Sequence, residues 1–120
     1  MMTRTKLALA GAALFLTAHA AGAADLAAGR ALFEKTCVSC HGADAKTSVD
    51  PSYPILAGQH EDYLVHALKA YRRGQSGAPA TANVRKNAVM GAFAAQLSDQ
   101  DIANVAAWLA RQPSDLGTRR

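Results

Sequence analysis

Residues 37 to 41 read Cys37-Val38-Ser39-Cys40-His41 and include the only two cysteines of the 120-residue chain. Two thiols at this spacing can bind zinc, cycle as a redox disulfide, or form thioether bonds to the two vinyl groups of one haem. A disulfide between residues so close cannot join distant segments, so a structural cross-link is excluded. The histidine directly after the second cysteine favours haem, because its imidazole can then bind the iron.

Two alternatives for this motif compete with haem. A zinc site would take Cys37, Cys40 and His41 as three ligands and would need His60 or His66 as the fourth. Structural zinc usually uses two separated ligand pairs, and here the second pair would be two histidines six positions apart. A thioredoxin-like redox motif expects a βαβ context, and no strand pattern precedes the first cysteine.

The N-terminus has the three parts of a secretory signal peptide. Two basic residues come first, an apolar run covers residues 7–18, and small residues occupy 21–23. The run is too short to span a membrane, although an uncleaved anchor helix is the alternative. We therefore expect cleavage after Ala23, with Ala24 or Ala20 as alternative sites, and we expect residues 24–120 to form one domain in a bacterial periplasm.

Removing this leader changes the balance of charge. The remaining chain keeps 11 of the 13 basic residues against 9 acidic ones, with no long basic run. We therefore expect no nucleic-acid partner. The remaining domain is also small for a self-sufficient core, and alanine supplies much of its apolar content. A bound group at its centre would make up part of this deficit.

The domain is predicted to be all-α, with three main helices joined by long loops. The first helix starts after Asp25 and brings Cys37 to its inner face, because apolar residues recur at helical spacing. The second covers residues 61–73 and should end at Gly74. The third starts at a capping box over residues 98–101 and stops before a proline.

The second axial ligand of a haem iron would come from Met90, His60 or His66. Met90 is the only methionine that remains after removal of the leader. It lies in the segment 84–97, whose pattern is ambiguous between a short helix and a turn. We interpret Met90 as the sixth ligand, with core filler or an open iron site as the alternatives.

The whole mature chain resembles a class I c-type cytochrome, of the short bacterial monohaem, cytochrome c-553-like type. The resemblance implies the class I cytochrome c fold around one covalent haem c, with the first and last helices crossing in contact. The residues that carry it are Gly29, Phe33, the Cys37–His41 motif, Pro54–Gln59, Tyr63, Leu64, Tyr71–Gly74, Met90, Leu97–Ile102 and Trp108.

The same resemblance implies contacts around the haem. Pro54 would offer its carbonyl to the ring N–H of His41, which orients the imidazole. The side chains that would pack on the macrocycle are Leu56, Leu64 and Leu68. The side chains that would meet the haem propionates are Tyr71, Arg72 or Arg73. Gly29 and Phe33 would pack near Trp108.

An iron with two protein ligands leaves one-electron exchange as the expected function, and we expect no enzyme activity. The partners would be redox proteins that dock transiently with a monomeric chain, with Arg85 and Lys86 as a docking rim or ordinary surface charges. One alternative is a dedicated cytochrome subunit of a periplasmic dehydrogenase or oxidase. Another is a haem enzyme or gas sensor with an open sixth position.

Overall fold

The computed structural model describes residues 22–116, and within this range the chain forms helices and no strand. The predicted leader lies outside the described residues except for its last two positions. Within the same range, no helix is both long and apolar enough to cross a membrane. The helices in chain order are α1 (Leu26–Leu32), a π-helix (Phe33–Cys37), α2 (Val38–His41), α3 (Glu61–Gln75), a 3-10 helix (Ala80–Ala82), α4 (Ala88–Ala94) and α5 (Asp99–Ala110).

The first helical run confirms the expected start. The Asp25 carboxylate accepts hydrogen bonds from the backbone N–H groups of Ala27 and Ala28, at 2.9 and 3.0 Å. Such a cap satisfies N–H groups that have no partner within the helix. The run then continues through the π-helix into α2 without leaving helical backbone angles. One continuous run therefore carries the polypeptide from its cap to the cysteine motif.

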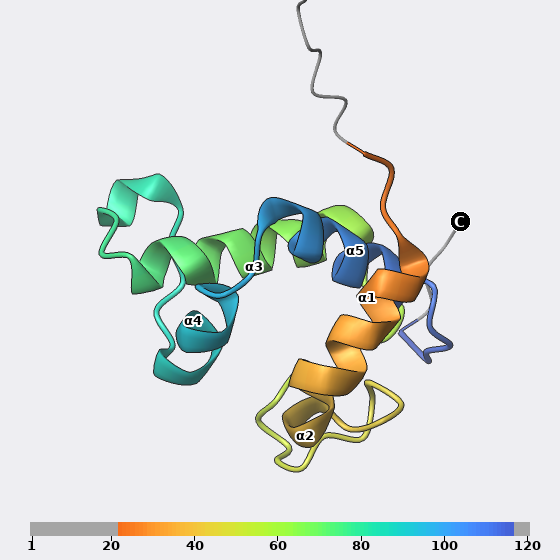
Figure 1. Ribbon diagram of the computed structural model, residues 1–120. Coiled ribbons are helices and arrows are strands. Elements are labelled where there is room, and N and C mark those ends of the chain that lie inside the picture. The colour runs from red at the N-terminus through yellow and green to blue at the C-terminus, as the bar shows by residue number, and fades with distance from the viewer. Residues whose placement is uncertain (1–21, 117–120) are drawn as a thin grey trace, which may run out of the picture.

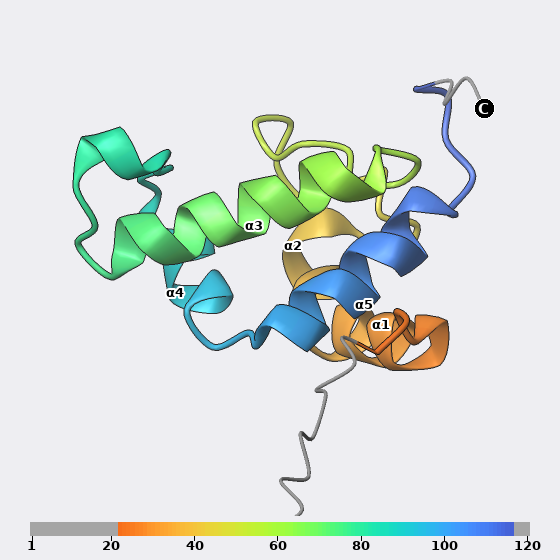
Figure 2. The same cartoon turned by 90° about the horizontal axis from the view of Figure 1, so that it is seen from above.

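Helices α1 and α5 cross in direct backbone contact, and they lie side by side in Figures 1 and 2. A Cβ atom added to Gly29 would lie 2.1 Å from the backbone oxygen of Asn104 and 3.1 Å from the Cβ of Trp108. One turn further along the same helical run, at the start of the π-helix, the Phe33 ring packs on the Trp108 ring with centroids 5.0 Å apart. The expected contact of the first and last helices is confirmed, and it explains the glycine in the middle of a helix.

A buried amide strengthens this crossing. Asn104 is only 7% exposed, and its side-chain oxygen accepts hydrogen bonds from the Asp25 backbone N–H and the Gln100 amide, both at 2.8 Å. A buried polar group is tolerated when it is paired in this way. The cap residue of α1 is thus tied to α5 through its backbone and to α1 through its side chain.

The hydrophobic core lies between α1, α3 and α5. Helix α5 begins with the expected capping box, in which Ser98 Oγ accepts from Asp101 N–H at 3.0 Å and the Asp101 carboxylate accepts from Ser98 N–H at 2.9 Å. Its apolar face then meets side chains from the other two helices and from the loop after α2. The buried cluster consists of Phe33, Ala45, Ala57, Leu64, Val105, Ala106 and Leu109.

The middle of the chain differs from the expectation in two ways. Helix α3 does not end at Gly74 but continues to Gln75, and Gly74 lies where the backbone of the next segment touches the helix. A Cβ atom there would lie 2.1 Å from the Arg85 carbonyl oxygen, so close approach rather than helix termination requires this glycine. The apolar spacing of the predicted helix 61–73 places Tyr63 on its inner face, but in the structure 49% of the Tyr63 surface is exposed.

The ambiguous segment 84–97 contains a fourth, short helix, α4. The Asn87 side chain caps it by accepting a hydrogen bond from the Met90 N–H at 2.9 Å. The buried residues of α4 are Gly91 and Ala94, and Gly91 packs against Gln75 of α3. Figure 1 shows α4 and α2 on the same side of α3, towards its two ends.

We predict that Gly29→Ala destabilises the protein by about 2 kcal/mol or more, because the new methyl group overlaps a backbone oxygen that cannot move alone. The loss should outweigh the ~1 kcal/mol that alanine gains over glycine in a helix interior. Guanidinium unfolding of the purified protein measures the difference.

Gly91→Ala is the matched control for this substitution. Its added methyl group meets the end of the Gln75 side chain, at 2.7 Å from Oε1, and that side chain can rotate away. We expect a change in unfolding free energy within about 1 kcal/mol of zero. Equal losses in the two variants would contradict the assigned role of the helix crossing.

Candidate haem site

The π-helix sets the position of the cysteine motif. It ends at Cys37, and α2 continues directly from it, so Cys37 and Cys40 are three positions apart on one helical run. Side chains at this spacing lie on the same helix face. Both cysteines are free and partly buried, and Cys37 packs against the hydrophobic core. The two thiols are therefore presented together on one face.

The His41 side chain is buried and held in one orientation. It is 6% exposed, and its Nδ1 lies 3.3 Å from the backbone oxygen of Pro54. A carbonyl can only accept, so Nδ1 carries the proton and Nε2 keeps its lone pair. The predicted contact between Pro54 and His41 is therefore present in the structure.

The electrostatic environment suits metal binding by this imidazole. Burial lowers the pKa of His41, and the hydrogen bond to Pro54 partly opposes that effect. The ring is consequently neutral at pH 7, the form in which histidine binds a metal ion.

The cysteines differ from a catalytic disulfide pair. Burial raises the pKa of the Cys37 thiol to about 11, and the neighbouring Cys40 adds to this rise. Redox-active cysteines in such motifs have lowered pKa values. Residues 22–36, the described part of the chain before the motif, also contain no strand, so the structure does not support the thioredoxin-like alternative.

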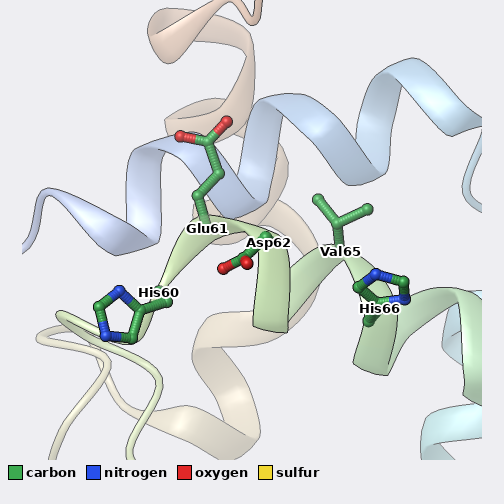
Figure 3. A pocket seen from close by; sticks show the side chains of 5 residues that line it. All are labelled: His60, Glu61, Asp62, Val65 and His66. Atoms are coloured by element: carbon green, nitrogen blue, oxygen red, sulfur yellow. The ribbon is translucent and has the colours of Figure 1, made fainter.

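The zinc alternative also lacks the necessary geometry. Among residues 22–116, no three side chains of the histidine, cysteine or acidic type are placed to share one metal ion. His60 and His66 line an open depression at the start of α3, with their rings at opposite ends and Asp62 between them (Figure 3). Neither histidine joins the cysteine motif.

The loop between α2 and α3 holds the Pro54 carbonyl in place. Ala45 has a left-handed backbone with φ of 55° and is fully buried. Its carbonyl oxygen accepts hydrogen bonds from the N–H groups of Leu56 and Ala57, at 2.9 and 3.1 Å. The Gln59 side chain donates a hydrogen bond to the carbonyl of Ile55, the residue after Pro54.

These bonds brace the stretch of loop beside His41 from two directions. Sequence reasoning recognised the stretch only by resemblance and did not identify Ala45 or Gln59 as its supports. The Ala45 contacts join residues more than ten positions apart, and the bond from Gln59 to Ile55 lies within an irregular loop, so no helical or strand pattern signals either of them.

Several predicted macrocycle contacts lie in one cluster. Leu56, Leu64 and Leu68 all pack in or against the core cluster that Cys37 also contacts. The fold therefore brings these side chains from the loop and α3 towards the first thiol. Their contact with a macrocycle stays a prediction.

Tyr71 and Arg72 have protein partners. The Arg85 guanidinium lies 5.6 Å from the centroid of the Tyr71 ring. Arg72 donates to the carbonyl of Leu97 at 2.9 Å and forms an ion pair with Asp99. These bonds tie α3 to the turn before α5. The predicted contacts of both residues with haem propionates stay predictions.

The site fits a covalently bound haem. Two free thiols lie on one helix face, the next residue is a neutral buried histidine with an available Nε2, and apolar side chains pack around the first thiol. Thioether bonds from Cys37 and Cys40 and an iron bond from His41 would use all three groups. This fold and site together define a class I c-type cytochrome.

Comparison with known proteins agrees with this class. The family model Cytochrome c matches residues 26–112. Cytochrome c-554(548) of Halomonas halodenitrificans is 45% identical over 78 residues, covering 64% of this chain and 84% of that protein. Cytochrome c4 of Stutzerimonas stutzeri is 38% identical over 101 residues, covering 83% of this chain and 46% of that protein.

A solved structure extends the comparison to the fold. Reduced cytochrome c4 from Pseudomonas stutzeri superposes with a TM-score of 0.65 at 38% identity, over 76% of this chain and 47% of that one. The chain thus spans about half the length of the cytochrome c4 proteins it matches. The chain belongs to the cytochrome c family, and its motif fits one haem c for electron transfer.

We predict that Gln59→Leu raises the reduction potential of the haem protein by a few tens of millivolts. Without the Gln59 amide, the loop would hold the Pro54 carbonyl less firmly. The His41 ring would then donate less electron density to the iron, and the ferric state would lose stability. A net hydrogen bond of about 1 kcal/mol corresponds to roughly 43 mV for one electron. A redox titration followed by absorption measures the shift.

Gln96→Leu is the matched control. Gln96 also donates its side-chain amide to a carbonyl four residues earlier, that of Ala92, at 3.3 Å. It lies after α4 and has no bond to the loop beside His41. An unchanged potential in Gln59→Leu, or an equal shift in both variants, would refute the positioning role of Gln59.

Proposed function

We propose that this protein is a periplasmic one-electron carrier whose haem iron is bound by His41 and Met90. The observation that supports the proposal best is the placement of α4. This helix carries the only methionine beyond the leader and lies on the same side of α3 as the cysteine motif (Figure 1). The Asn87 cap holds the Met90 backbone at the start of the helix.

The chain braces both proposed ligands. Once bound, the haem supplies one-electron exchange between Fe(II) and Fe(III). His41 is oriented by the Pro54 carbonyl, and α4 is seated on α3 where Gly91 meets Gln75. Rigid ligands keep the geometry nearly constant between oxidation states, and a thioether ligand raises the potential. If His41 and Met90 both bound the iron, no position would remain open for a substrate, which favours a carrier over an enzyme.

The start of the folded domain agrees with export and cleavage after Ala23. Asp25 already takes part in the fold, since its side chain caps α1 and its backbone N–H is bonded to Asn104. A domain of residues 24–120 would keep every one of these contacts. We therefore propose that residues 1–23 are a signal peptide and that the carrier works in the periplasm.

We predict that Met90→Ala abolishes the methionine–iron absorption band of the ferric protein and allows the ferrous protein to bind carbon monoxide. The reduction potential should fall by on the order of 100 mV, within the ~0.8 V range that axial ligands span. Absorption spectra of both redox states, with and without carbon monoxide, measure the change.

Val89→Ala serves as the control for Met90→Ala, because Val89 is the preceding residue of the same helix and is 52% exposed. It should keep the parent spectrum and stay inert to carbon monoxide. Ready binding of carbon monoxide by the parent protein would instead favour an enzyme or sensor with an open iron position. An unchanged spectrum in Met90→Ala would disprove the assigned ligand.

A free carrier and a dedicated subunit differ in how they purify from their native source. For the free carrier we expect the haem protein to elute alone as a monomer in gel filtration at moderate salt. Transient redox complexes have small interfaces and dissociate under these conditions. Recovery of a stable, stoichiometric complex with a dehydrogenase or oxidase would assign the subunit role.

A further inference from the structure

A short irregular segment after α5 packs against the rest of the domain. Residues 111–116, called the strap below, leave the helix beside the residues that lead into α3 (Figures 1 and 2). The Gln112 side chain donates a hydrogen bond to the carbonyl of Trp108 at 2.8 Å, which holds the start of the strap to α5. Pro113 follows, and its ring fixes the backbone angle φ. The strap therefore leaves the helix along a defined course.

The strap lies directly on the loop beside His41. A Cβ atom added to Gly58 would lie 2.5 Å from the Cβ of Ser114 and 3.4 Å from the backbone oxygen of Gln112. Gly58 is buried, its φ is 74°, and Ser114 is half-buried. The Gly58 backbone thus packs on the Ser114 side chain, at a distance that leaves no room for a side chain on the loop.

One buried carbonyl joins the loop and the strap. The backbone oxygen of Leu109 accepts a hydrogen bond from the Gly58 N–H at 2.9 Å and another from the Gln112 N–H at 3.0 Å. Leu109 is 3% exposed and belongs to the hydrophobic core. The two segments are therefore held at the same point of α5.

Gly58 is also coupled to the carbonyl that orients His41. It lies four positions after Pro54, and both of its neighbours are bonded to other parts of the loop. The Ala57 N–H donates to the Ala45 carbonyl at 3.1 Å, and the Gln59 side chain donates to the carbonyl next to Pro54. A displacement of Gly58 would therefore disturb the stretch that begins at Pro54.

We propose that Ser114 is a positioning residue for His41, and that the strap holds the loop so that the Pro54 carbonyl keeps its bond to the imidazole. The inference rests on the proposed function, since it takes His41 as an iron ligand. A carbonyl bonded to a ligand imidazole fixes the ring and raises its basicity. Displacing the strap would weaken that bond and favour Fe(II) over Fe(III).

A methyl group at Gly58 tests the contact. Gly58→Ala should displace the strap, because the new methyl group overlaps the Cβ of Ser114 rather than the end of a flexible side chain. Gly77→Ala is the matched control. Gly77 has nearly the same backbone angle, with φ of 77°, but an added Cβ there has no atom within 4 Å. It introduces the same backbone strain without touching the strap.

The reverse change at Ser114 completes a cycle of variants. Ser114→Gly removes the contact without adding a group, so it tests the strap even if Gly58→Ala fails to fold. In the double variant Gly58→Ala/Ser114→Gly, the methyl group takes the space of the missing serine side chain. Its next contact, the Gln112 oxygen at 3.4 Å, is an ordinary one. Each single variant should loosen the loop, and the double variant should restore it.

Two measurements on the haem-loaded protein report the effect. The first is the rate at which the His41 Nδ1 proton exchanges with solvent in the ferrous protein, followed by NMR. The second is the ratio of Fe(II) to Fe(III) at the midpoint potential of the parent protein. Both quantities should rise about threefold or more in each single variant, and both should return towards the parent values in the double variant.

The possible results separate the strap from the iron ligand. Parent-like exchange in Ser114→Gly, or a double variant looser than both single variants, would overturn the proposal. A change in Gly77→Ala equal to that in Gly58→Ala would also overturn it, since backbone strain alone would then explain the effect. Faster exchange with an unchanged Fe(II) to Fe(III) ratio would support the strap and refute His41 as an iron ligand.

Discussion

The contact between the backbones of Gly29 and Asn104 is the constraint on which the rest of the structure depends. It lets α1 and α5 approach closely enough for Phe33 to pack on Trp108 and for the Asn104 amide to reach the Asp25 backbone. Because α1 continues through the π-helix into α2, this crossing also sets where the two thiols and the imidazole lie. The haem motif is thus positioned by a contact two turns of helix away.

Helix α3 connects the two halves of the site. Its first part contributes Leu64 and Leu68 to the core around Cys37, and its last part seats α4 and the segment before it. Arg72 adds bonds from α3 to the turn that starts α5. The core beside the cysteine motif and the helix that carries Met90 therefore both pack against α3.

The long loop after α2 shows how a small domain can order irregular chain without a large core. Ala45 accepts left-handed backbone strain at a fully buried position, and its carbonyl then binds two N–H groups of the segment beside His41. The Gln59 amide holds the same segment from its other end. Hydrogen bonds supply order where few large apolar side chains are available.

The sequence by itself determined the features that depend on near neighbours: the cysteine–histidine motif, the caps at Asp25 and Ser98, and the all-α class. Resemblance to a family added the Pro54–His41 bond and the helix crossing, which local pattern cannot supply. Only the tertiary structure decided that α3 passes through Gly74, that Tyr63 faces outward beneath Arg85, and that α4 forms around Met90. These features depend on close backbone approach and side-chain contacts between distant segments. The free energies of such contacts exceed the differences in helix propensity between residues.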